Sequence, residues 1–141
     1  MNLSAKVEYA CIAVLELSAH WGSAEPVRIR DIAEAHGVPA RFLVQILLQL
    51  KAAGIVQSTR GATGGYWLAR SPEQITLAEV MAVIEGPSAV QSNVAVATKT
   101  TQALISVWNE VINRQREMLE AITFGELAAR VREPSEEMYH I

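Results

Sequence analysis

Apolar residues recur at helical spacing through the first third of the chain. Residues 4–20 carry them at every third or fourth position behind a suitable N-cap, Ser4, and this pattern predicts an amphipathic helix. Residues 21–28 break the pattern with a glycine and a proline, which predicts a linker or a short edge strand. The next segment, IRDIAEAHG, predicts a short helix that ends at Gly37.

A second apolar stripe begins after the short connection GVP. The segment VPARFLVQILLQLKAAG predicts a helix with Pro39 in its first turn and its end at Gly54. Because so short a connection does not let the two helices pack antiparallel, they are expected to cross steeply, as in a helix-turn-helix. The residues expected on the buried face of the second helix are Phe42, Leu43, Ile46, Leu47 and Leu50.

Two strand-like segments, IVQST and YWLAR, flank a turn that holds Gly61, Gly64 and Gly65. A phosphate-binding P-loop needs GxxxxGK[ST], and a dinucleotide site needs GxGxxG before a helix. The spacing here is GxxGG before a strand, so a phosphate cradle is disfavoured. We expect a hairpin in which Gly64 and Gly65 adopt the positive φ angles of a tight turn.

The pattern turns helical again after the hairpin. TLAEVMAVIE predicts a helix over 76–85, with Thr76 and Glu79 at the spacing of a capping box. No period is visible in the next dozen residues, which predicts a loop. A long helix from about 100 to 122 and a short one over 124–131 follow.

Helix, helix-turn-helix and hairpin, in this order, are typical of a winged helix. The predicted fold is mainly α with a small β-hairpin wing: a winged helix-turn-helix plus a long C-terminal dimerisation helix. The expected domains are the winged helix-turn-helix DNA-binding domain at 1–86, a loop at 87–99, the dimerisation helix and short final helix at 100–132, and a flexible acidic tail at 133–141.

The long helix has an apolar stripe that a small core does not need. Such stripes commonly pair between subunits, which predicts a homodimer; the alternative is a helix folded onto its own domain. The predicted dimerisation residues are Leu104, Trp108, Val111, Ile112, Gln115, Met118, Leu119 and Ile122.

Charge is distributed unevenly along the chain. The net charge is −3, but residues 28–70 hold six basic and two acidic residues, a local +4, so the remainder carries −7. A basic segment on an acidic body favours a DNA-facing surface, with chance clustering on a solvated face as the alternative. No apolar run of about 18 residues predicts a membrane span, and the amphipathic start does not resemble a signal peptide, so we expect a cytoplasmic protein with no membrane partner.

Other chemistry finds little support in the sequence. Its three histidines, His20, His36 and His140, are scattered without metal-ligand spacing, and no nucleophile stands beside a base in a recognisable arrangement, so neither a metal site nor an enzyme is predicted. The single cysteine, Cys11, is expected to be a small core residue, with a redox role as the alternative. A cavity between the long helix and the winged helix, near Trp21 or Trp108, is a candidate ligand site, with ordinary packing as the alternative for both.

The segments YACIAVLELSAH, LKAAGIVQSTRGATGGYWLAR and ITFGELA resemble the Rrf2 family of bacterial transcription regulators, and the resemblance covers nearly the whole chain. It implies a homodimer of winged helices that binds double-stranded DNA at a two-fold-related operator. Periodicity places Arg41 and Gln45 outward for base or phosphate contacts, Arg28 and Arg30 near phosphates, and Arg60 on the wing for a minor groove. With the resemblance, the predicted DNA-binding residues are Arg28, Arg30, Pro39, Ala40, Arg41, Gln45, Gln49, Thr59, Arg60, Thr63 and Gly64.

The chain departs from its family at the sensor. Many members hold an iron–sulfur cluster on three cysteines in the loop before the long helix, whereas this chain has none between Pro87 and Trp108 and has Gln102 where one member type uses a histidine. Glu8 matches a carboxylate ligand of some members, but clusters need several soft donors, so no cofactor is expected. The resemblance leaves a small ligand, a protein effector or thiol oxidation as the signal. Members of the family often have an acidic residue at the position of Val44, so the base preference of this chain is expected to differ from theirs.

The sequence therefore leaves two alternative functions from different classes. The first is a sequence-specific transcription regulator, expected to act as a repressor. The second is a winged helix that serves as a protein-interaction module without specific DNA binding, favoured by the acidic total and by the apolar Val44 and Leu48 on the presumed reading face. Salt-sensitive DNA binding separates the two.

Overall fold

The computed structural model of the 141-residue chain describes residues 1–61, 64–87 and 89–133. Its elements follow the predicted order. They are α1 (Ala5–Ala19), α2 (Ile29–His36), α3 (Ala40–Ala52), β1 (Val56–Thr59), β2 (Gly65–Leu68), the 3-10 helix η1 (Pro72–Gln74), α4 (Leu77–Glu85), α5 (Lys99–Glu120) and α6 (Phe124–Arg132). The short helix η1 is the element that the sequence pattern did not predict. No helix among these described residues combines the length and the apolar character that crossing a membrane requires.

Helix α1 is the centre of the hydrophobic core. It packs against α3, α4 and α6, and its residues Val7, Ala10, Val14 and Leu17 are buried. Side-chain caps fix the start of four α-helices, because an unpaired N–H at a helix start needs an acceptor. These caps are Ser4 for α1, Thr76 for α4, Thr98 for α5 and Thr123 for α6.

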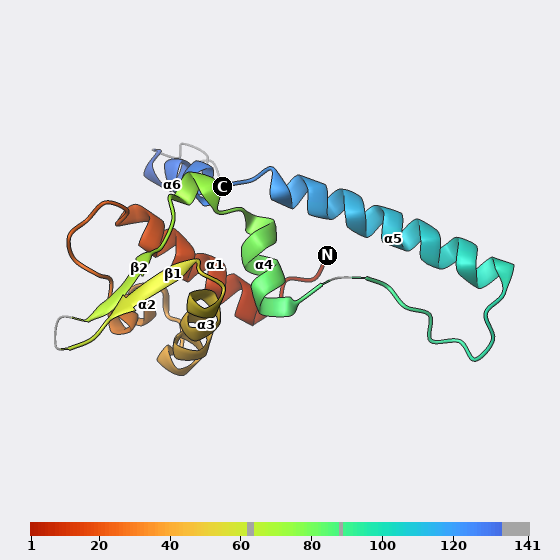
Figure 1. Cartoon of the computed structure of the whole chain (residues 1–141), viewed down its shortest axis with the longest axis horizontal. Helices are drawn as coiled ribbons and strands as arrows, with labels where there is room; N and C mark the ends of the chain where they lie inside the picture. The colour runs from red at the N-terminus through yellow and green to blue at the C-terminus, as the bar shows by residue number, and fades with distance from the viewer. Residues whose placement is uncertain (62–63, 88, 134–141) are drawn as a thin grey trace, which may run out of the picture.

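The wing is an antiparallel hairpin in which Val56 pairs with Leu68 and Thr59 pairs with Gly65. Its free edge is extended by one bridge, because Val27 in the linker exchanges two backbone hydrogen bonds with Tyr66, of 2.9 and 2.8 Å. Of the two alternatives predicted for 21–28, the structure shows a linker, with one edge bridge at Val27. Figure 1 shows the hairpin, α2 and α3 together at one end of the molecule.

The glycines of the hairpin do not have the roles that the sequence predicted. Gly61 has the positive φ, +102°, and Gly64 and Gly65 do not. Gly65 is needed for close approach instead, because a Cβ there would lie 2.5 Å from the carbonyl oxygen of Val27. A Cβ on Gly64 would lie 2.7 Å from the carbonyl oxygen of Thr59. The sequence pattern does not reveal that the bridge at Val27 requires a residue without a Cβ at position 65.

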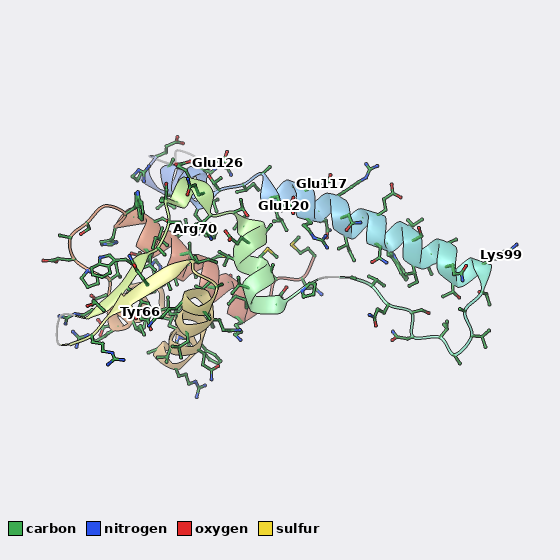
Figure 2. All side chains as sticks on the ribbon, viewed as in Figure 1. Tyr66, Arg70, Lys99, Glu117, Glu120 and Glu126 are labelled. Carbon is green, nitrogen blue, oxygen red and sulfur yellow. The ribbon has the colours of Figure 1, made fainter. Side chains whose placement is uncertain are left out.

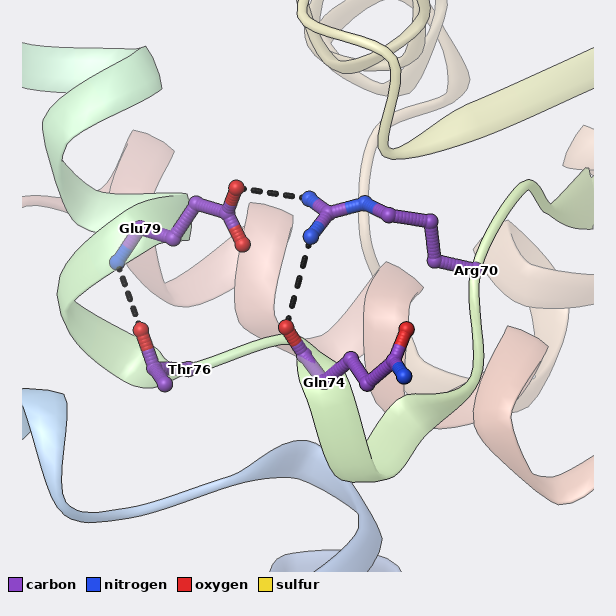
Figure 3. A network of polar contacts seen from close by, with 4 residues as sticks. All are labelled: Arg70, Gln74, Thr76 and Glu79. Carbon is purple, nitrogen blue, oxygen red and sulfur yellow. Dashed lines mark hydrogen bonds and ion pairs between the residues drawn. The ribbon is translucent and has the colours of Figure 1, made fainter.

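An ion pair joins the wing to α4 (Figure 3). Arg70, just after β2, donates from Nη2 to Oε2 of Glu79 at 2.6 Å and from Nη1 to the carbonyl oxygen of Gln74 at 3.3 Å. Thr76 caps α4 by accepting the N–H of Glu79 at 3.2 Å, as predicted. The Glu79 carboxylate binds Arg70, so only half of the expected capping box forms, and α4 is fixed to the end of the wing.

Helix α5 extends away from the rest of the molecule (Figure 1). It packs on α4, and none of its 22 residues, all of them described, is buried. Lys99 lies at the far end (Figure 2). The loop before α5 is held to it at Val90, whose N–H donates to Oδ1 of Asn109 at 2.8 Å and whose carbonyl oxygen accepts from Nδ2 of Asn109 at 3.3 Å. The C-terminal part of α5 thus packs on its own winged helix, and the rest of α5 extends away from it.

Candidate DNA-binding surface

A turn of three residues joins α2 to α3. Gly37 ends α2 in the left-handed conformation, φ +64°, which a residue without a Cβ adopts at little cost. Val38 turns into the core at 4% exposure, and Pro39 serves as the N-cap of α3 instead of lying within its first turn. Because Val38 anchors the turn, the start of α3 faces outward.

Helix α3 separates a buried row from an exposed one. Leu43, Ile46, Leu47 and Leu50 are fully buried. The exposed row holds Ala40, Arg41, Val44, Gln45 and Leu48. Val44 is 43% and Leu48 54% exposed, which is high for apolar side chains on a short helix. The first two turns of α3 thus present two hydrogen-bonding side chains, Arg41 and Gln45, between apolar ones.

Two α3 residues differ from their predicted positions. Phe42 was expected in the core but is 38% exposed, because it lies at the flank of the buried row, where its ring meets Tyr9 of α1 at 6.0 Å and Arg41 at 5.1 Å. The Arg41 guanidinium is therefore preordered by a cation–π contact. Gln49, expected to point outward, is half-buried, and its Oε1 is enclosed without a hydrogen-bond donor from the described residues.

The wing carries the other predicted DNA contacts. Thr59 and Arg60 are exposed at the end of β1, and Gly64 is half-buried, with its N–H donating to the carbonyl oxygen of Gly61 at 2.9 Å. Thr63 lies outside the described residues. The hairpin therefore places Arg60 beside the turn, at the same end of the molecule as α3 (Figure 1).

The basic residues of the segment 28–70 do not all serve one surface. Arg28, Arg30, Arg41 and Arg60 are exposed on α2, α3 and the wing. Arg70 instead pairs with Glu79, between the hairpin and α4 (Figure 2). Lys51 donates to Oγ of Ser58 at 2.7 Å and so ties the end of α3 to β1. The local charge at the reading surface is smaller than the sequence count indicates.

The structure also contains contacts that the sequence pattern did not predict. His36, at the end of α2, bonds through Nε2 to Oε1 of Glu16 on α1 at 2.6 Å and fixes the first helix of the helix-turn-helix against the core. The partner of His36 is 20 positions away, so no local pattern signals this contact.

The predicted dimerisation residues divide into groups. Leu104, Trp108, Val111 and Met118 are exposed on one side of α5, with Trp108 at 48%. Ile112, Gln115 and Leu119 are half-buried and line a groove of about 810 Å³ with α4. Ile122 lies beyond the end of α5, where its carbonyl oxygen accepts the N–H of Leu77 at 3.0 Å.

The cavities differ from the one the sequence suggested. Neither Trp21 nor Trp108 lines the groove between α4 and α5. Trp21 lines a separate cavity of about 330 Å³ on the winged helix, together with Trp67. Trp108 is on the exposed side of α5.

Cys11 is partly enclosed in α1, and burial raises the pKa of its thiol from 9.0 to about 11. At pH 8 a thiol with this pKa is only about one part in a thousand thiolate, the reactive form. We therefore expect Cys11 in the folded protein to react far more slowly with a disulfide reagent at pH 8 than in urea-unfolded protein, as followed by absorbance. Equal reaction rates in the folded and the unfolded protein would contradict the burial of the Cys11 thiol.

The same raised pKa affects stability at high pH. The folded state holds the thiol proton more tightly than the unfolded state does. The contribution of Cys11 to the free energy of unfolding is therefore fully present below pH 9.0 and is lost as the pH rises toward about 11. Cys11→Ala is expected to reduce this loss, as measured by urea unfolding at pH 8 and pH 10.5.

Comparisons with known proteins agree with this geometry. A protein of Mycobacterium tuberculosis named as an HTH-type transcriptional regulator is 37% identical over 132 residues, which are 91% of this chain and 81% of that protein. The structure of CymR, the global cysteine regulator of B. subtilis, superposes with a TM-score of 0.78 at 28% identity over 92% of this chain and 98% of that one. The T. potens IscR structure gives a TM-score of 0.75 at 30% identity over 99% and 96%.

The family model described as Rrf2, iron-dependent transcriptional regulator, matches residues 3–130. The resemblance found in the sequence, the winged-helix fold and the regulator class are thereby confirmed, and this class is not one of enzymes. The chain belongs to the Rrf2 family of transcriptional regulators.

Proposed function

We propose that the chain is a homodimeric regulator that binds a two-fold-related operator and represses transcription. The observation that carries the proposal is the placement of α3, whose start is exposed, at the same end of the molecule as the wing, while α5 carries an exposed apolar row toward the other end. A helix-turn-helix reads the major groove with the N-terminal part of its second helix. Two copies related by α5 would present two such helices.

Each predicted contact then has a chemical role. Arg41 suits a guanine edge or a phosphate, and Gln45 suits an adenine edge. Arg28 and Arg30, at the start of α2, suit phosphates. Val44 and Leu48 offer only apolar contact, for example to a thymine methyl group. Pro39 and Ala40 would bring the backbone of α3 close to the DNA. Gln49 is half-buried, so it supports the helix more than it reads bases.

Arg60→Ala is expected to weaken operator binding by about 1–3 kcal/mol, because the variant loses the proposed contact of the wing arginine with a narrow minor groove. The DNA is chosen by in-vitro selection with the wild-type protein, and affinity is measured by fluorescence anisotropy. Arg130→Ala, an exposed arginine on α6, is the matched control and should change affinity little. Equal affinities of Arg60→Ala and wild type would remove Arg60 from the interface.

Val111→Glu is expected to dissociate the dimer, because a charge buried without a partner in an apolar interface costs about 3–5 kcal/mol. Val111 lies on the exposed apolar row of α5, and Ser106, on the opposite side of the same helix, provides the control Ser106→Glu. Sedimentation velocity distinguishes the species. A Val111→Glu dimer as tight as wild type would place the interface elsewhere.

The residues present do not fit an iron–sulfur cluster. The chain has one cysteine, which is in α1, and the loop 87–98 contains no cysteine, histidine or carboxylate. Among the described residues no group of three or more such side chains is arranged to hold a metal ion. Since a cluster needs several thiolates, we propose that regulation uses another signal, such as a small ligand or a protein effector.

A second function is favoured by the apolar reading face. Val44 and Leu48 suit a protein partner as well as a thymine methyl group, and the chain is acidic overall. A protein-interaction module would bind DNA weakly and without preference. Neutralised phosphates make true DNA binding fall steeply with salt, so affinities at several salt concentrations separate the two functions.

A further inference from the structure

A small aromatic cavity lies on the winged helix, away from α5. It is an open hollow of about 330 Å³ between the end of α1 and the outer face of the hairpin, and Trp21 and Trp67 both line it. Two of the chain's three tryptophans therefore meet at one cavity. Its volume is at the lower end of the range of about 300–1,000 Å³ that small-molecule sites occupy.

The hairpin register explains why Trp67 points there. Val56 and Leu68 are paired across the strands and face the core, both nearly fully buried. The next pair, Gln57 and Trp67, must therefore face the opposite side. An indole on the outer face of a two-stranded wing serves no core packing, yet Trp67 is half-buried because it forms a wall of this cavity.

The second indole faces the cavity from the linker. Trp21 follows the end of α1 and is 49% exposed. The ring contact among the described residues is that of Tyr9 with Phe42, so Trp21 and Trp67 line one space without stacking on each other. A planar ligand ring can therefore stack on the part of either indole that lines the cavity.

Three polar side chains complete the lining: His20, Gln57 and Ser23, whose Oγ accepts the N–H of Glu25 at 3.2 Å. His20 Nδ1 lies 2.9 Å from the carbonyl oxygen of Glu16, and because a carbonyl only accepts, Nδ1 carries the hydrogen. In the uncharged ring Nε2 is then an acceptor. Gln57 adds an amide that donates and accepts. The described residues that line the cavity include no carboxylate, lysine or arginine, so the site favours an uncharged ligand.

We propose that this cavity binds a small, uncharged, planar nitrogen heteroaromatic of one or two rings. The ring stacks against an indole, its N–H donates to Nε2 of His20, and its second polar atom meets the Gln57 amide. Trp67 and Gln57 belong to the strands that carry the wing turn, so a bound ring would link the wing to α1. That this changes operator affinity rests on the proposed function; the binding itself does not.

The test uses the full chain with Trp108→Phe, which leaves Trp21 and Trp67 as the emitting indoles. Benzimidazole at pH 8, where it is uncharged, is titrated without DNA, and benzoate is the charged control of similar size. We expect saturable quenching with benzimidazole and only linear, collisional quenching with benzoate. Trp21→Leu, in an exposed linker, is expected to raise the dissociation constant about tenfold by removing one stacking surface.

Gln57→Ala is a second variant at an exposed position that the fold tolerates, and it should weaken binding several-fold. The proposal is overturned if benzimidazole gives no saturable quenching up to its solubility limit. It is also overturned if both variants bind as tightly as their parent, or if benzoate binds equally well. A change of oligomeric state in Trp21→Leu, seen by sedimentation, would show instead that a second copy covers the cavity.

Discussion

Phe124→Ala is expected to lower the free energy of unfolding by about 3–5 kcal/mol, the cost of truncating a fully buried aromatic side chain. Phe124 is among the largest side chains with no exposure, and its N–H donates to the carbonyl oxygen of Ile75 at 2.8 Å. It starts α6, which packs on α1 and η1. Since domains have only about 5–15 kcal/mol in total, this loss would leave a marginal fold.

The measurement is urea unfolding followed by circular dichroism at one fixed protein concentration, because association adds to stability. The only other phenylalanine of the chain gives the control. Phe42→Ala removes a ring that is 38% exposed, so its cost should be much smaller. Equal costs for the two variants would contradict the role of α6 in the core of the winged helix.

Gly65→Ala is expected to destabilise the wing by about 1–3 kcal/mol, because the new methyl group overpacks the backbone. Its Cβ would lie 2.5 Å from the oxygen and 2.8 Å from the carbon of the Val27 carbonyl. Relief requires breaking the bridge between Val27 and Tyr66, which would free the hairpin edge. Operator binding through the wing should weaken with it, as measured by anisotropy.

Gly125→Ala is the matched control for that clash. A Cβ there would meet the carboxylate of Glu73, which is the far end of an exposed and flexible side chain. Glu73 can move aside, and alanine is the better helix former in α6, so stability should hold or rise slightly. Comparable losses at Gly65 and Gly125 would show that the backbone contact at Val27 is not what matters.

The fold was predictable where local rules decide it. Apolar period and caps such as Ser4 and Thr76 indicated the helices, and the structure agrees with each. The glycine roles were wrong because they depend on tertiary contacts. Which glycine takes a positive φ, and which one lies against Val27, follows from the edge bridge, and no local spacing encodes it.

The candidate DNA-binding surface was predictable to about the same extent as the fold. Periodicity placed Arg41 and Gln45 outward, and both are exposed. It could not show that Arg70 is held by Glu79, or that the Phe42 ring meets Tyr9 of α1, because each contact depends on how elements pack. The residues named for DNA binding and for dimerisation remain predictions until the variants above are measured.

The packing of α5 on the short helix α4 has a consequence for geometry at the operator. A helix of 22 residues is about 33 Å long, so a rotation of about 5° at α4 moves its far end by about 3 Å. That is close to one base-pair step of about 3.4 Å. In a dimer joined through α5, the half-site spacing would therefore depend on the stiffness of this joint, and a small tilt there would amount to a change of register along the DNA.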